Sequence, residues 1–419
     1  MSDTYTKFRN EVMAGGADNP DLEPTAGGPT AVIGLGVIAV LLVALYLWSS
    51  WAFVFVIGLL ISIFFHELGH FVTARWTGMK ATQFFLFMGP KLWSFRRGET
   101  EYGLRAYPIG AFVRIIGMNN LDEVEPGDEA RAYRNKSYPR RMLVITAGSM
   151  MHVLIAIALI FSVYAVNGRR VETGRVGIGS VSAGYPANAA GVEPGDIVLS
   201  IDGVQPRTPD QFVDEIRSHE PGDAVTLVLE RDGTTLTKDV RLGANPTPGE
   251  GLGTAFLGVG FGNEVDWNNE SIASAAVDSV RDLGPTMWAS LGGVVKVLNP
   301  VNIVGHLTGS NEDLNTRPTT VVGISKLSDS IGDESGFGGL LLTLAAVNVF
   351  VGLLNLFPVL PFDGGHAAIA TYERVRTRRG RAPYRADITK MIPVAMTMMA
   401  VLLMLFVTGL YLDFAKPLP

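Results

Sequence analysis

Long apolar segments constrain this chain more than any other feature. Crossing the hydrocarbon core of a bilayer takes about 20 apolar residues in a helix. The regions that reach this length are 31–72, 142–166, 338–358 and 391–412. The first is too long for one crossing and is interrupted at Trp48-Ser49-Ser50-Trp51. We therefore predict a crossing helix at 51–75 and an extra apolar segment at 31–50, whose own crossing the sequence leaves open.

Composition supports a membrane protein and excludes several classes. Only 18% of the 419 residues are charged, which is low for a soluble chain of this length. The net charge of -6, without a basic block, predicts no nucleic-acid partner. The chain has no cysteine, so a protein metal site would use His, Asp or Glu. Residues 1–30 are polar and do not resemble a signal peptide; we expect a disordered tail.

Loop charge orients the predicted crossings. The connections 76–141 and 367–390 are rich in Lys and Arg, and both are predicted to be cytoplasmic by the positive-inside rule. The long connection 167–337 then lies outside the cell membrane. Within it, residues 175–243 alternate strand-like runs with Asp-Gly turns, which predicts a small folded α+β domain. Residues 271–307 have an amphipathic pattern that is typical of a helix lying along the membrane surface.

The predicted crossing at 51–75 carries the sequence His66-Glu67-Leu68-Gly69-His70. Residues i and i+4 share one face of a helix, so His66 and His70 can bind one zinc ion. Glu67 is placed to accept a proton from a zinc-bound water and pass it to a leaving amine. A chance match is the competing interpretation, but two His and a Glu at the end of an apolar run are costly unless bound or paired.

A catalytic zinc ion needs a third protein ligand. The best candidate is Asp363, which ends the run Asn355-Leu356-Phe357-Pro358-Val359-Leu360-Pro361-Phe362-Asp363. His366 is a rival ligand three residues later, and an incidental Asp in a cytoplasmic turn is the competing interpretation. Pro358 and Pro361 predict a break in the helix, and the freed backbone groups must line a cavity or find partners.

Together, the sequences at 66–70 and 355–366 resemble the motifs of the site-2 protease family of intramembrane zinc metalloproteases, over residues 51–413. The resemblance implies one zinc ion per chain, held by His66, His70 and Asp363, with Glu67 as the general base. It implies that Asn355, Pro358 and Pro361 hold a transmembrane substrate in extended form. Residues 97–113 resemble the family's β-hairpin, which dips towards the active site; a solvated cytoplasmic hairpin is the alternative.

Residues 176–263 resemble a PDZ domain, on the run Pro186 to Ile197 and on Ile201-Asp202-Gly203. Leu257, Gly258 and Val259 resemble the loop that cradles a peptide's terminal carboxylate. The resemblance implies that this domain screens substrates outside the membrane; a purely structural role is the alternative.

One residue departs from the family pattern. Members often carry Gly-Pro-x-x-Asn in the second crossing, where this chain has Gly148-Ser149-Met150-Met151-His152. His152 could donate a hydrogen bond to the developing oxyanion. It could instead only link two helices through a hydrogen bond, as we expect of Asn348 in the third crossing.

The predicted fold is a membrane α-helical bundle of four core transmembrane helices, with an optional fifth at the N-terminus, a β-hairpin region and an inserted α+β PDZ domain. The predicted boundaries are 1–30, 31–50, 51–75, 76–141, 142–166, 173–263, 264–337, 338–366, 367–390 and 391–413.

The predicted function is zinc endopeptidase cleavage of single-pass membrane proteins, such as anti-sigma factors or signal-peptide remnants. Lipid and peptide C-termini are the other expected partners. The predicted location is the cell membrane, with the PDZ domain extracytoplasmic. A membrane-anchored PDZ scaffold with a vestigial metal site is the alternative from a different class. A soluble-type zinc protease on an anchor is disfavoured, because no third ligand follows the motif at a suitable spacing.

Overall fold

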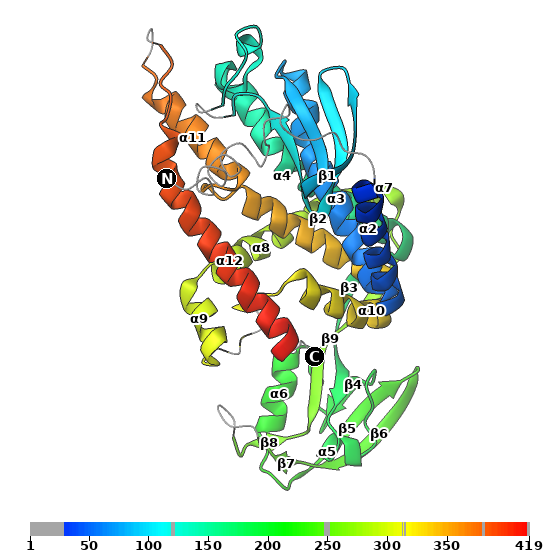
Figure 1. Cartoon of the computed structure of the whole chain (residues 1–419). Coiled ribbons are helices and arrows are strands. Elements are labelled where there is room, and N and C mark those ends of the chain that lie inside the picture. The colour runs from blue at the N-terminus through cyan, green and yellow to red at the C-terminus, as the bar shows by residue number, and fades with distance from the viewer. Residues whose placement is uncertain are drawn as a thin grey trace. The chain divides into compact units, whose positions relative to one another are not determined.

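A computed structural model describes residues 29–118, 122–246, 252–311, 313, 316–378 and 382–416 (Figure 1). The tail predicted at 1–30 lies outside the described residues, apart from its last two positions. The chain divides into two compact units, a helical unit formed by residues up to Val163 and from Ala276 onward, and a β unit formed by Tyr164–Ala275. Each unit is described by itself below.

The helical unit holds the long helices and one β-hairpin. Its helices are α2 (Pro29–Trp48), α3 (Ser50–Trp76), α4 (Tyr138–Asn167), α7 (Ile272–Arg281), α8 (Leu283–Val297), α9 (Pro300–Thr308), α10 (Val321–Asn355), α11 (Asp363–Arg376) and α12 (Ile392–Ala415). Short 3-10 helices are η1 (Glu129–Arg131), η2 (Tyr133–Asn135) and η4 (Ile388–Met391). The ends of α4 and α7 continue into the β unit.

Five helices in the described part of the chain are long and apolar enough to cross a membrane. They span Ala31–Trp48, Ser50–Trp76, Tyr138–Asn167, Ser335–Asn355 and Ile388–Ala415. The segments Ile272–Val297 and Pro300–Thr308 would add a sixth crossing if this pair, bent by 65°, were one broken span. Ser49 separates α2 from α3 because its side chain caps α3 by accepting from the Ala52 amide. The chain is therefore a multi-pass membrane protein.

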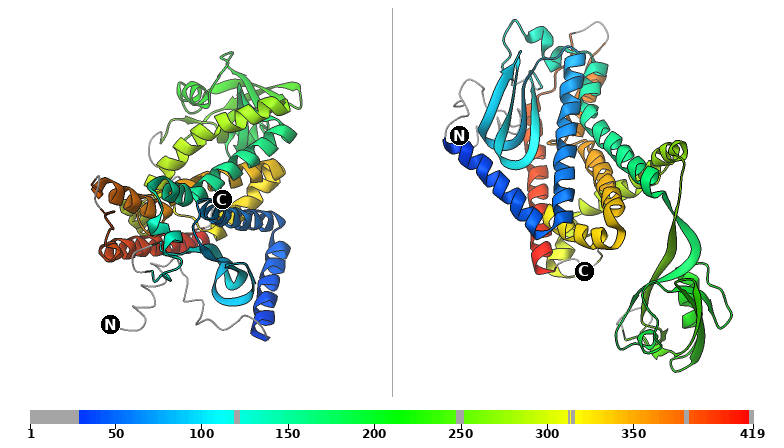
Figure 2. Two further views of the ribbon diagram at one scale, coloured as in Figure 1. Left: turned by 90° about the horizontal axis from the view of Figure 1, so that it is seen from above. Right: turned by 90° about the vertical axis from the view of Figure 1, so that its right-hand side faces the viewer.

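The hairpin of β1 (Ala81–Arg97) and β2 (Thr100–Ile115) folds over on itself. Phe85 pairs with Gly103 on one side and with Phe112 on the other, so the two strands form four short segments. The bends use positive φ angles at Phe87, Gly89 and Gly110, which favour glycine. The hairpin lies beside α3 (Figures 1 and 2). Segment 111–115 is thus one outer edge of this small sheet.

Glycines let the central helices approach closely. A Cβ atom on Gly69 of α3 would lie 2.8 Å from the Ala147 carbonyl oxygen of α4, and one on Gly352 of α10 would lie 3.0 Å from the His152 Cβ atom. Nearer the start of α3, Phe55 packs against Leu340 of α10. Helix α4 is therefore in close contact with α3 near Gly69 and with α10 near Gly352.

A buried ion pair fixes the end of α11. The Arg141 guanidinium of α4 lies 2.7 Å from the Glu373 carboxylate, and both side chains are almost fully buried. The second Glu373 oxygen accepts a hydrogen bond of 2.8 Å from the Ala386 amide. Because α11 begins with Asp363, this pair ties the helix that carries Asp363 to the helix that carries His152.

The C-terminal helix is attached to the start of α10 through Asp413. The fully buried Asp413 carboxylate accepts hydrogen bonds from the Thr320 amide, the Thr320 hydroxyl and the Gly323 amide at 2.9, 2.6 and 3.0 Å. The Arg317 guanidinium lies 3.6 Å away. A carboxylate at a helix N-terminus satisfies amides that have no partner within the helix.

The β unit is a sheet with one well-formed helix. Its elements are β3 (Arg169–Val181), α5 (Pro186–Ala189), β4 (Ile197–Ile201), α6 (Pro209–Arg217), β5 (Ala224–Arg231), β6 (Thr234–Arg241), β7 (Gly243–Ala244), β8 (Ala255–Phe256) and β9 (Val259–Asn268). The five-stranded sheet has the order β6-β5-β4-β3-β9, which leaves β9 at an edge. The β unit extends beyond the predicted range 173–263 at both ends, because β3 and β9 continue to pair as far as Arg169 and Asn268.

One ion pair joins two parts of this unit. The fully buried Asp196 carboxylate accepts hydrogen bonds from Arg231 Nε at 2.6 Å and from Arg231 Nη2 at 2.9 Å. Burial alone would raise the pKa of Asp196, but the Arg231 guanidinium and the Glu193 amide outweigh it and hold this pKa below its usual value. The pair therefore stabilises the fold above about pH 4, and this stabilisation is lost as the pH falls through the lowered pKa.

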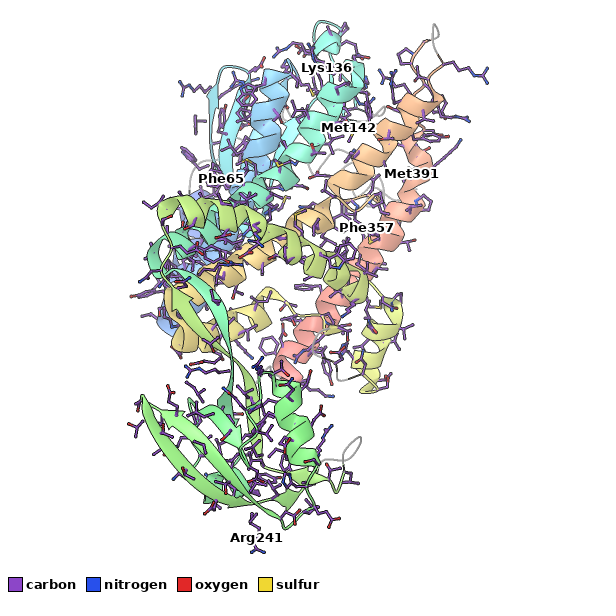
Figure 3. The ribbon with its side chains drawn as sticks, turned by 180° about the vertical axis from the view of Figure 1, so that it is seen from behind. Phe65, Lys136, Met142, Arg241, Phe357 and Met391 are labelled. Carbon is purple, nitrogen blue, oxygen red and sulfur yellow. The ribbon has the colours of Figure 1, made fainter. Side chains whose placement is uncertain are left out.

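Replacing Arg231 with methionine should lower the free energy of unfolding of the β unit, because the buried Asp196 carboxylate would lose the guanidinium that compensates its charge. On acidification, the backbone amides of the variant should lose their protection from hydrogen exchange at a higher pH than those of the parent chain, since the Asp196 pKa would rise. Hydrogen exchange of β3, β4 and β5 in the full-length protein in detergent measures both effects. Arg241→Met is the matched control, because Arg241 is exposed and points away from the unit (Figure 3). Equal protection in both variants would contradict the assignment.

Candidate metal centre

Two segments far apart in sequence form the centre. His66 and His70 lie one turn apart on the buried face of α3. Asp363 is the first residue of α11, directly after the turn that follows α10. Figure 3 labels Phe65, next to His66 on α3, and Phe357 in that turn. The hydrophobic packing of α3 against α4 and α10 brings these two segments together.

The three donor atoms converge at distances that fit a tetrahedral metal. His66 Nε2 lies 3.2 Å from His70 Nε2, and Asp363 Oδ2 lies 3.4 Å from His66 Nε2 and 3.2 Å from His70 Nε2. Zinc binds such atoms at about 2.0–2.1 Å, so two ligands of a tetrahedral ion are roughly 3.3–3.4 Å apart. These are the only three His and acidic residues that form such a group among the described positions.

The hydrogen bonds around the centre leave the donors available. His70 Nδ1 lies 2.8 Å from the Val144 carbonyl oxygen, which can only accept, so Nδ1 carries the proton and Nε2 presents its lone pair. Asp363 Oδ2 is buried and has no hydrogen-bond partner among the described residues. A buried carboxylate oxygen without a donor is costly. The lone pair of His70 Nε2, the neighbouring His66 Nε2 atom and an orphaned carboxylate oxygen therefore form a donor set that suits a cation.

Gly148 of α4 leaves the space for that cation. A Cβ atom at this position would lie 2.7 Å from His66 Nε2 and even closer to His70 Nε2. Any larger residue would press on both donor atoms. The glycine that starts the Gly-Ser-x-x-His sequence of α4 is thus part of the wall of the centre.

The turn after α10 sets the position of Asp363. Pro358 and Pro361 lie in this turn. Several backbone amides of the turn donate hydrogen bonds within it, such as the Phe362 amide to the Val359 carbonyl oxygen at 3.1 Å. A Cβ atom on Gly365 would lie 2.7 Å from the Val359 carbonyl carbon, and one on Gly364 would overlap the Leu356 carbonyl group. The two glycines therefore let the turn fold tightly against the first turn of α11.

Glu67 lies between the centre and the hairpin. It follows His66 on α3 and is partly buried, and its carboxyl group lies close to the backbone amide of Val113. Val113 belongs to segment 111–115, the outer edge of the folded-over hairpin. The geometry thus places a strand edge directly beside the candidate general base.

His152 is close to the centre but is not one of its three donors. Its ring centroid lies 5.0 Å from that of His66, and its Nδ1 atom lies 2.9 Å from Asn348 Oδ1. His152 therefore links α4 to α10 at the border of the centre, and its donation of a hydrogen bond to an oxyanion stays a prediction. His366, the rival ligand, lies one turn into α11 and is not part of the converging group.

The remaining predicted residues lie around two different features. Asn355 is the last residue of α10, partly buried, and Pro358 and Pro361 are exposed in the turn that follows. Leu257, Gly258 and Val259 lie in the β unit, where Leu257 is buried and Gly258 has a φ of 83°. The Leu257 and Gly258 carbonyls accept hydrogen bonds from the Ala187 and Ser182 amides.

Three contributors were not predicted as parts of the centre. The Val144 carbonyl is a backbone group, so the identity of the residue at this position does not indicate its role. Asn348 was predicted to link two helices, but its partner His152 could not be identified without the packing of α10 on α4. Gly148 was visible as the start of a motif, yet its role in leaving space for a metal depends on the distance between helices.

The centre combines two imidazoles, a carboxylate and an adjacent glutamate, and the chain has several membrane-length helices. Together these features define the class of membrane-bound zinc metalloproteases. The chain belongs to peptidase family M50, whose family model matches residues 54–404. This is the site-2 protease family that the two motifs predicted, and the prediction of a zinc-dependent protease is confirmed.

Named relatives extend over most of the chain. Zinc metalloprotease Rip1 of Mycobacterium tuberculosis is 30% identical over 397 residues, which cover 87% of this chain and 97% of that protein. Zinc metalloprotease Rip1 of Mycolicibacterium smegmatis is 29% identical over 399 residues, with the same coverage. Among solved structures, the PDZ domain of an SdrC-like protein from Listeria monocytogenes is 26% identical, covers 22% of this chain and 90% of that one, and has a TM-score of 0.20.

Replacing Gly148 with alanine should lower zinc affinity by roughly tenfold or more, because the new methyl group would displace His66 and His70. Alanine favours a helix over glycine by about 1 kcal/mol, so the fold of α4 should not suffer. Zinc per chain, measured by mass spectrometry after purification in detergent, reports the loss. Gly36→Ala is the matched control, since a Cβ atom there meets nothing within 4 Å. Full zinc content in Gly148→Ala would show that the space beside the imidazoles is not the metal site.

Proposed function

We propose that the protein is an intramembrane zinc endopeptidase that cleaves transmembrane segments of other membrane proteins. The observation that supports this most directly is the convergence of His66, His70 and Asp363, each on or next to a membrane-length helix. A soluble-type site would be placed in an aqueous domain. Here all three donors come from the helical unit.

In this proposal, His66, His70 and Asp363 hold one zinc ion, which lowers the pKa of a bound water and polarises a carbonyl group. Glu67 accepts a proton and later delivers it to the leaving amine. The hydrogen bond from His70 to the Val144 carbonyl fixes the ring, so that the donor atom stays aligned. Val144 and Gly148 both belong to α4. This helix therefore orients a ligand through the Val144 carbonyl and borders the centre at Gly148.

The substrate must be extended before it is cut, because helical carbonyls are shielded in hydrogen bonds to the amide four residues later. Segment 111–115 supports an extended pose, since it is a strand edge next to Glu67. A substrate strand could add to this edge through backbone hydrogen bonds. Asn355, Pro358 and Pro361 directly precede Asp363 in sequence, and in the proposal they hold the substrate on its other side.

The β unit is proposed to be an extracytoplasmic PDZ domain, with 76–141 and 367–390 in the cytoplasm. The supporting feature is the edge strand β9, because PDZ grooves bind a peptide as an added strand. Helix α6 lies along this strand, with Phe212 packed edge to face against Phe261 at 5.3 Å. Leu257, Gly258 and Val259 would receive the carboxylate of a peptide C-terminus at the start of β9.

Replacing Glu67 with alanine should leave zinc bound and reduce cleavage by roughly 10²- to 10⁴-fold, because the general base is lost while the ligands remain. Quantitative proteomics of membranes from cells that carry Glu67→Ala should show uncleaved membrane proteins that wild-type cells process. Zinc content of the purified variant separates loss of chemistry from loss of metal. Glu220→Ala, an exposed position in the β unit, is the control. Cleavage at the wild-type rate in Glu67→Ala would overturn the mechanism.

The third ligand can be tested against its rival. Asp363→Ala should remove zinc, because two imidazoles alone leave the cation undercoordinated. His366→Ala should keep zinc at the wild-type level, since His366 is not among the converging donors. Metal analysis of both variants under the same purification decides between them. Zinc loss in His366→Ala together with retention in Asp363→Ala would reverse the assignment.

A further inference from the structure

Asn348 of α10 and His152 of α4 form a buried polar pair inside the helical unit. His152 is 3% exposed and Asn348 is 1% exposed, so neither side chain can rely on solvent. His152 Nδ1 lies 2.9 Å from Asn348 Oδ1, and Asn348 Nδ2 donates a hydrogen bond of 2.8 Å to the Leu344 carbonyl oxygen. A chain of two hydrogen bonds thus runs from the backbone of α10 to the imidazole ring.

This chain fixes which ring nitrogen carries the proton. The Leu344 carbonyl can only accept, so the end of the Asn348 amide that faces it must be the NH₂ group. The Oδ1 end then faces His152, and an amide oxygen can only accept. His152 Nδ1 must therefore donate. In the neutral ring the other nitrogen, Nε2, is left with a lone pair and no proton.

The close contact of the two helices holds this arrangement in place. Gly352 lies one turn after Asn348, and a Cβ atom there would lie 3.0 Å from the His152 Cβ atom and 3.3 Å from the Ser149 carbonyl oxygen. The helices are therefore too close for α10 to shift along α4 without a clash. His152 borders the centre, since its ring centroid lies 5.0 Å from that of His66.

We propose that Asn348 is a positioning residue that holds His152 with its proton on Nδ1, so that His152 Nε2 accepts a hydrogen bond from a backbone N–H of the extended substrate. The proposal rests on the function proposed above. A substrate strand buried away from water exposes both N–H and C=O groups, and each needs a partner. A bare imidazole nitrogen pairs with an N–H and repels a carbonyl oxygen.

This role differs from the one first expected for His152. Donation to the oxyanion would require a proton on Nε2, and in the neutral ring that proton is already on Nδ1, bonded to Asn348. His152 thus positions the substrate backbone, while the carbonyl group that is attacked is left to other groups. An Asn at position 152, as in many family members, could present either end of its amide, whereas His152 with Asn348 presents an acceptor only.

The tautomer can be tested without any substrate. Protein labelled with ¹⁵N-histidine gives separate chemical shifts for protonated and bare ring nitrogens, and the signals that disappear in His152→Ala belong to this residue. We expect a protonated Nδ1 and a bare Nε2 in the wild-type chain, and loss of this single tautomer in Asn348→Leu. Thr343→Val removes a hydroxyl group that is hydrogen-bonded only within its own helix, and it should leave the signals unchanged. A proton on Nε2 in the wild-type chain would overturn the proposal.

The coupling to substrate is tested with a double-mutant cycle. Asn348→Leu should lower kcat/KM for a membrane peptide by about tenfold, and should cause no further loss in a His152→Ala background. Additive losses would overturn the proposal, because Asn348 would then act independently of His152. Zinc content and thermal stability of each variant identify losses that come from misfolding.

The substrate group is tested with peptides in which one amide near the mapped cleavage site is replaced by an ester, which removes one N–H. One such ester should weaken cleavage by the wild-type enzyme and make no difference in His152→Ala. If no ester shows this pattern while the wild-type enzyme cleaves the parent peptide, the hydrogen bond is refuted and the proposed function stands. If the wild-type enzyme cleaves no membrane peptide and Glu67→Ala cells accumulate no membrane protein, the proposed function itself fails.

Discussion

The meeting of the Asp363 carboxylate with the imidazoles of His66 and His70 is the interaction on which the rest of the structure depends. A buried carboxylate oxygen without a donor is costly, and the His70 lone pair that faces it adds to the cost. A bound cation turns this unfavourable arrangement into a favourable one. The protein must therefore hold three groups from two segments at the spacing that a small metal ion demands, against their mutual repulsion when the ion is absent.

Several features of the helical unit serve this requirement. Gly69 and Gly352 let α3 and α10 approach α4, and Gly148 leaves space at the point where they meet. The tight turn against Gly364 and Gly365 sets the start of α11, while the Arg141–Glu373 pair fixes its other end to α4. The site is thus placed by helix contacts and by one buried ion pair, and no loop carries a donor on its own.

The sequence was sufficient for the chemistry of the centre and insufficient for its surroundings. His66 and His70 could be predicted because helical periodicity alone puts them on one face. Asp363 was preferred over His366 mainly because the two motifs together resemble those of the site-2 protease family. The Val144 carbonyl, the space beside Gly148 and the partner of Asn348 depend on distances between helices, which no local pattern encodes. The folding of the hairpin over on itself also could not be predicted from the sequence, because its register depends on bends at Phe87 and Gly89.

Glu67 lies beside the Val113 amide, and this proximity has a consequence for substrate entry. An open strand edge readily pairs with unrelated chains, and most proteins cover such edges. Here the edge at 111–115 runs past the side chain that the proposed chemistry needs. A strand that paired with this edge would be brought to Glu67 in the same event. Binding and exposure to the general base would then be a single step, so a chain that does not pair with the edge would not be presented to Glu67.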